Sequence, residues 1–66
     1  MKEYATIYKQ DLELFEELLE QDSALAGEIA IAILEHAFNV PEEEKLIQNP
    51  YITAYVKQKR NVYSNP

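Results

Sequence analysis

The chain has 66 residues, with twelve acidic residues, six lysines and arginines, one histidine and no cysteine, which gives a formal charge of −6. This length has room for one small domain and is short for a catalytic domain with its own substrate cleft. The lack of cysteine excludes disulfides, thiolate metal sites and cysteine nucleophiles, and it fits a reducing compartment.

Nothing in the sequence predicts contact with a membrane. The first residues, MKEYATIYKQD, lack the uninterrupted apolar stretch of a secretory signal. The longest apolar run, residues 29–34, is far shorter than a bilayer-spanning segment. We therefore expect a cytoplasmic protein without a membrane partner.

A first helix is predicted over residues 6–21, because leucines and other apolar residues recur at helical spacing on one side and glutamates lie on the other. Asp11 breaks this pattern, since it falls in the middle of the apolar side. One interpretation makes Asp11 the N-cap, so that the regular helix begins at Leu12. The other is a longer helix whose carboxylate faces a partner.

A second helix is predicted over residues 23–39, after a possible N-cap at Asp22 or Ser23. It is apolar almost all round, so it must be covered on most sides. The run IAIAIL could also form a buried strand, but its alanines, its length and its flanking caps favour a helix. Small residues would let neighbouring helices approach this one closely: Ala26, Gly27, Ala30 and Ala32.

A proline-containing connector follows, with a short helical turn predicted over residues 41–47. Asn49 and Pro50 are a strong start signal for a last helix over residues 49–63, because Asn caps well and Pro suits the first helical position. These elements predict an all-α fold, a small three-helix bundle with a short extra helical connector.

The second helix also predicts self-association. A chain of this size buries only about 60% of its unfolded surface, and two short amphipathic helices cover an all-apolar helix poorly. We expect a homodimer that buries the remaining apolar surface, with a monomeric three-helix bundle as the alternative. The predicted dimer interface consists of Ala26, Ile29, Ala30, Ile33 and Ala37.

Charge is divided along the chain. Residues 1–48 hold all twelve acids, whereas residues 49–66 hold three cations and no acid. The acidic face of the first helix is either a solvated surface or an imitation of phosphates that occupies a basic site. The last helix mixes tyrosines with cations, yet the net charge repels nucleic acid, so we do not expect a nucleic-acid partner. The predicted partner-binding residues are Glu13, Glu16, Glu17, Glu20, Tyr55, Lys59 and Arg60.

No catalytic or metal site is predicted. His36 is the only histidine, either a pH-sensitive group or a packed one, and no second histidine or cysteine completes a triad with it. Glu28 and Glu35 share a helical stripe, but the E-x-x-H spacing of di-metal bundles is missing. We expect a protein that is not an enzyme and needs no cofactor or metal.

Two segments carry a resemblance to a known family. The run AILEHAF (residues 32–38), followed by NVPEEE, and the last helix from NPYI to KRNVYSN resemble a helical phage and prophage domain. That domain is similar to ones at the N-terminus of replication-organiser proteins, which implies no catalytic residues. The sequence thus predicts a phage-related protein–protein interaction module that dimerises through its central helix and binds a host or phage protein. The alternative is an acidic inhibitor that occupies the basic nucleic-acid-binding site of a host protein.

Overall fold

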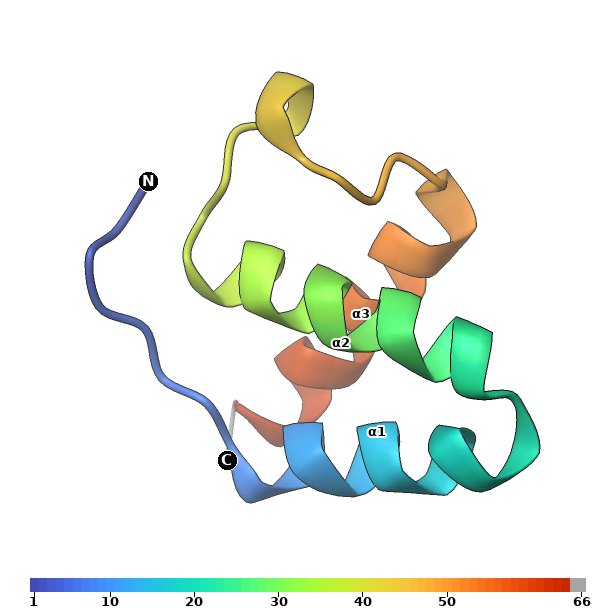
Figure 1. The fold of residues 1–66 in the computed structure, drawn as a ribbon. Coiled ribbons are helices and arrows are strands. Elements are labelled where there is room, and N and C mark those ends of the chain that lie inside the picture. Colours follow the sequence, from blue (N-terminus) through green and yellow to red (C-terminus); the bar gives the residue numbers. More distant parts are fainter. Residues whose placement is uncertain (65–66) are drawn as a thin grey trace.

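Three α-helices and one 3-10 turn make up the part of the chain that the computed structural model describes, residues 1–64. The helices are α1 (Lys9–Gln21), α2 (Ser23–Ala37) and α3 (Pro50–Tyr63), and the turn is η1 (Glu42–Glu44). α1 and α2 run in opposite directions, while α3 crosses behind α2 (Figure 1). The all-α prediction is confirmed, and IAIAIL is helical. No helix within residues 1–64 is long and apolar enough to cross a bilayer.

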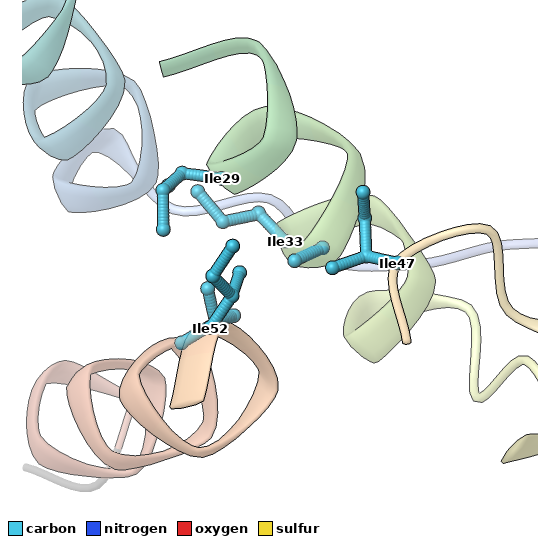
Figure 2. Packing of buried hydrophobic residues seen from close by; sticks show 6 residues of the cluster. Ile29, Ile33, Ile47 and Ile52 are labelled. Carbon is cyan, nitrogen blue, oxygen red and sulfur yellow. The ribbon is translucent and has the colours of Figure 1, made fainter. Parts of the chain in front are cut away.

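The core lies where α2 meets its neighbours. Isoleucines from α2, the connector and the start of α3 point toward one another there (Figure 2). α2 is central because its sequence is apolar on most sides, so it packs on α1 with one side and on α3 with another. The cluster consists of Ile29, Ala32, Ile33, Ile47, Ile52 and Val56, with Leu14, Leu18 and Leu25 packed against it.

Two predicted helix starts are confirmed. The Asp22 carboxylate accepts a hydrogen bond of 3.1 Å from the Leu25 N–H at the start of α2. The Asn49 side chain accepts one of 2.9 Å from the Tyr51 N–H, and Pro50 is the first residue of α3. Each cap satisfies a backbone donor that has no partner inside its helix.

The start of α1 differs from the prediction. Residues 6–8 are not helical, and the expectation that Asp11 is the N-cap is wrong, because the helix already begins at Lys9. Tyr8 is the N-cap, and Asp11 lies three residues later. The Tyr8 N–H donates to the Asp11 carboxylate at 2.9 Å, and the Asp11 N–H donates to the Tyr8 carbonyl at 3.0 Å. Asp11 therefore stabilises the helix start from inside the first turn.

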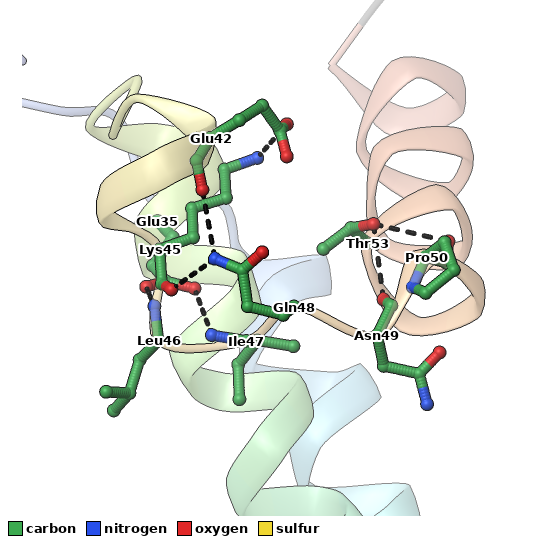
Figure 3. Close-up of polar contacts among 9 residues, drawn as sticks. All are labelled: Glu35, Glu42, Lys45, Leu46, Ile47, Gln48, Asn49, Pro50 and Thr53. Atoms are coloured by element: carbon green, nitrogen blue, oxygen red, sulfur yellow. Dashed lines mark hydrogen bonds and ion pairs between the residues drawn. The ribbon is translucent and has the colours of Figure 1, made fainter.

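The end of α2 comes two residues before the predicted position 39. Asn39 has a φ of 54°, a left-handed conformation that Asn tolerates and that ends a helix. The connector then returns toward α3, and the Glu35 carboxylate holds it by accepting from the Leu46 and Ile47 N–H groups at 2.5 and 3.2 Å (Figure 3). This contact places Ile47 in the core, whereas Leu46 stays 75% exposed.

Candidate functional site

Large apolar side chains remain exposed on the outer side of α1 and α2. Ile31 and Leu34 of α2 are 36% and 47% exposed, and Leu12 and Leu19 of α1 are 54% and 46% exposed. A groove of about 190 Å³ lies between the two helices, and Leu12 and Leu34 both line it. Leu19 and Ile31 continue the same sides of their helices by the three- and four-residue spacing of helical stripes. Together with Gly27, these four residues form what we call the α1–α2 face.

Gly27 is the only glycine of the chain, and it lies inside α2. Glycine in a helix interior is about 1 kcal/mol less favourable than alanine. Its φ is negative, so the backbone does not need glycine here. A Cβ atom built on Gly27 would have no neighbouring atom within 4 Å, so the packing of the chain does not need it either. The position is a notch that opens outward on the α1–α2 face.

Acidic side chains border this face on α1. Glu16 lies one helical turn after Leu12, and Glu20 directly follows Leu19. Both glutamates are exposed. Among the acids of α1, only Asp11 forms an ion pair within residues 1–64. The face therefore combines an apolar centre with a negatively charged edge, an arrangement typical of interaction surfaces with a polar rim.

A second polar feature, a cluster of hydrogen-bonded side chains, is buried at the first turn of α1. Arg60 of α3 donates from Nε to both carboxylate oxygens of Asp11, at 3.0 and 3.3 Å. Its Nη1 donates to Nδ1 of His36 at 2.9 Å, and its Nη2 donates to the Thr6 carbonyl at 2.7 Å. The Tyr63 hydroxyl also donates to Asp11. Arg60 thus ties the N-terminal segment, α1 and α2 to α3.

Two tyrosines close this polar cluster. The Arg60 guanidinium lies 5.4 Å from the centre of the Tyr8 ring, a cation–π arrangement. The Tyr8 and Tyr63 rings meet edge to face, with centroids 5.9 Å apart. Burial, and then the hydrogen bond to Asp11, raise the pKa of Tyr63 well above its usual value. No buried side-chain nitrogen or oxygen within residues 1–64 lacks a hydrogen-bond partner. The cluster is a fully hydrogen-bonded network that stabilises the packing of the helices.

His36 is neutral in this arrangement. Arginine has donors only, so Nδ1 of His36 must accept the bond from Arg60, and the ring hydrogen lies on Nε2. Burial, and then the nearby charges of Arg60, Lys45 and Lys57, lower the pKa of His36 below its usual value. Of the two interpretations of this residue, the structure favours a packed histidine with one specific hydrogen bond.

The predicted dimer residues lie mostly inside the single chain. Ala26, Ile29, Ile33 and Ala37 are at most 6% exposed, and only Ala30 is half-buried. A second copy cannot reach these four without unfolding the chain. The core-facing side of α2 and its outer side are both apolar, and the prediction named mainly residues of the core-facing side. Dimerisation itself stays a prediction, with other residues available for it.

The predicted partner-binding residues divide into three groups. The four glutamates of α1, Glu13, Glu16, Glu17 and Glu20, are exposed as expected. Tyr55 is 37% exposed, and Lys59 lies 5.6 Å from the centre of its ring. Arg60 is only 5% exposed and is paired with Asp11, so it is a structural residue and offers no charge to a partner.

A second apolar groove, of about 270 Å³, opens between α2 and α3 beside the end of α1. Leu18, Leu25, Ile29 and Ile52 line it, and Tyr51 and Tyr55 form its border. Tyr51 is 85% exposed, so its ring lies at the outer edge of the groove. This groove shares no lining residue with the groove of the α1–α2 face.

Within residues 1–64, no three metal-binding side chains of His, Asp or Glu lie close enough to hold an ion. Comparison of the chain with protein-family models, curated proteins and solved structures finds no match. The α1–α2 face brings four exposed large apolar side chains together on two neighbouring helices. The interface residues predicted from the sequence left out Leu34 and Ile31, although Ala24, Gly27, Ile31 and Leu34 recur at spacings of three, four and three residues.

Proposed function

We propose that this chain is a non-enzymatic protein–protein interaction module, phage-related by its resemblance, whose docking surface is the α1–α2 face. One observation carries the proposal: four large apolar side chains on two neighbouring helices are exposed around an open glycine notch. Exposed apolar patches bordered by polar residues mark interaction sites. The buried polar side chains within residues 1–64, in contrast, all have hydrogen-bond partners.

Site-specific photo-crosslinking in cells tests this function without knowledge of the partner. Benzoylphenylalanine placed at position 19 or 34 is expected to give discrete adducts, because both positions lie on the docking surface. The same probe at position 43 of the connector or 58 of α3, both exposed, is the matched control. Adducts that are absent, or equally strong from all four positions, would contradict the proposal.

The acidic inhibitor is the second candidate function. It is supported by the four exposed glutamates of α1, none of which forms an ion pair within residues 1–64. Such a surface competes with phosphates for a basic site, and its binding weakens as salt rises. The test is retention of heparin-binding bacterial proteins on the immobilised chain at low and high salt. Glu16→Lys with Glu20→Lys should abolish retention, while Glu43→Lys with Glu44→Lys, the same charge change on η1, should not. Equal retention by both double variants would exclude this function.

A further inference from the structure

The partner that the α1–α2 face fits best is a second copy of this chain, an inference that rests on the docking function proposed above. The chain exposes 4880 Å² for a mass of 7.7 kDa. Folded monomers of that mass expose about 4,300 Å² by the usual scaling of area with mass. The excess of about 580 Å² is a large part of the ~800 Å² that each partner buries in a stable interface. Met1 and Tyr4 are among the exposed large apolar residues, as are the four of the α1–α2 face.

The open position at Gly27 favours an occupant that approaches the helix backbone closely. Neither backbone conformation nor packing within the chain accounts for glycine at this position. A helix that crosses α2 at Gly27 would fill the notch, and an added Cβ would push that helix away. The chain therefore tolerates a helix-weakening residue at a position where only an outside partner benefits from it.

The spacing of the outer residues of α2 makes this surface complementary to itself. Its N-terminal half presents the small residues Ala24 and Gly27, and its C-terminal half presents the large residues Ile31 and Leu34. If two α2 helices lie antiparallel and cross at position 29, Gly27 faces Ile31 of the second copy. Ala24 then faces Leu34 of the second copy. Each copy supplies both the notch and the side chain that fills it, as a two-fold interface requires.

We propose that two chains associate through antiparallel α2 helices that cross beside Gly27, with Leu12 and Leu19 of α1 flanking the contact. No unrelated partner is needed to explain why the small residues lie in one half of this stripe of α2 and the large residues in the other half. The edges of the two faces are acidic, through Glu16, Glu20 and Glu28. Like charges at the edges repel each other less at higher ionic strength, so association should tighten as salt is added.

Substitution of Gly27 distinguishes an effect on association from an effect on the stability of the monomer. Gly27→Ala should raise the thermal midpoint of the monomer, measured far below the dissociation constant, because alanine favours helix. The same change should raise the dissociation constant at least tenfold in sedimentation equilibrium, and Gly27→Leu should leave only monomer. Ala54→Leu, at an exposed position of α3, is the control that should leave association unchanged. Unchanged association of both Gly27 variants would overturn the crossing at this residue.

Disulfide trapping tests the register, because the natural chain has no cysteine. A mixture of Gly27→Cys and Ile31→Cys chains should oxidise to the mixed dimer, whereas a parallel pair would join each variant to itself. A chain that stays monomeric at all concentrations, while position 34 still crosslinks to another protein, would refute the second copy and leave the docking function intact. Loss of all discrete adducts would refute both.

Discussion

Asp11 and Arg60 lie 49 positions apart in the sequence and form a buried ion pair, with Arg60 Nε 3.0 Å from the Asp11 carboxylate. Their side chains are 2% and 6% exposed. Each charge has further partners: Tyr8 and Tyr63 donate to Asp11, and Arg60 also donates to His36 and Thr6. Because each guanidinium nitrogen of Arg60 and both carboxylate oxygens of Asp11 have a partner, the pair fixes how α3 sits on α1.

Removal of one member of this pair should be costly. Arg60→Met leaves the Asp11 carboxylate buried without its counter-charge, and breaking such a pair typically costs about 3–5 kcal/mol. That loss approaches the whole stability of a small domain. Urea unfolding followed by circular dichroism measures the change. The double variant Asp11→Leu with Arg60→Met removes both charges and should unfold at a higher urea concentration than Arg60→Met alone. If the free energy of unfolding of the single variant fell by less than about 1 kcal/mol, the pair would not fix α3 on α1 as described.

His36 should make folding stability depend on pH near neutrality. Its pKa is lowered in the folded chain, so the unfolded chain binds its proton first as the pH falls below about 6.5. Stability should therefore decrease as the pH falls from about 6.5 toward the lowered pKa, and should be independent of this group at pH values well above that range. His36→Gln keeps an acceptor for Arg60 but does not titrate, so its unfolding midpoint should fall less over that range. Parallel pH profiles for the two proteins would contradict this account.

Glu35 should stabilise the connector rather than α2, the helix on which Glu35 lies. Its carboxylate binds the N–H groups of Leu46 and Ile47, and removal of a hydrogen-bonded acceptor costs about 1 kcal/mol. Glu35→Ala should accelerate hydrogen exchange at these two amides while α1 exchanges as before. Glu28→Ala, seven residues earlier on α2 and exposed, is the control. Exchange at Leu46 that is unchanged in Glu35→Ala would show that other contacts hold the connector.

Two neighbouring isoleucines of α2 should respond differently to the same substitution. Ile33 is 4% exposed and belongs to the core, so Ile33→Asp buries a charge without a partner and should unfold the chain. Ile31 is 36% exposed on the α1–α2 face, so Ile31→Asp should keep the helical circular dichroism signal and remove association. A folded Ile33→Asp chain, or an unfolded Ile31→Asp chain, would contradict the placement of α2.

The helices and their starts were predictable because their causes are local. Caps at Asp22 and Asn49 act on amides two or three residues away, and apolar periodicity shows itself within a few turns. Asn39, where the left-handed turn ends α2, was within reach of the same reasoning, and the predicted helix ran two residues past the end of α2 at Ala37.

Asp11 shows where local reasoning stops. A carboxylate on the apolar side of a helix needs a partner, and only the folded chain brings Arg60 to it from 49 positions away. The interpretation of Asp11 as an N-cap assumed a partner close in sequence, which is the common case but not this one.

The sequence by itself determined that this chain forms an acidic, all-helical domain with a nearly all-apolar middle helix, since composition, caps and periodicity act over short distances. Only the tertiary structure decided which side of α2 is core and which side is left open. A helix that is apolar on nearly every side has no periodic pattern that identifies its core-facing side. The tertiary structure also decided that Arg60 is interior and that Gly27 faces outward, since both depend on how three helices cross.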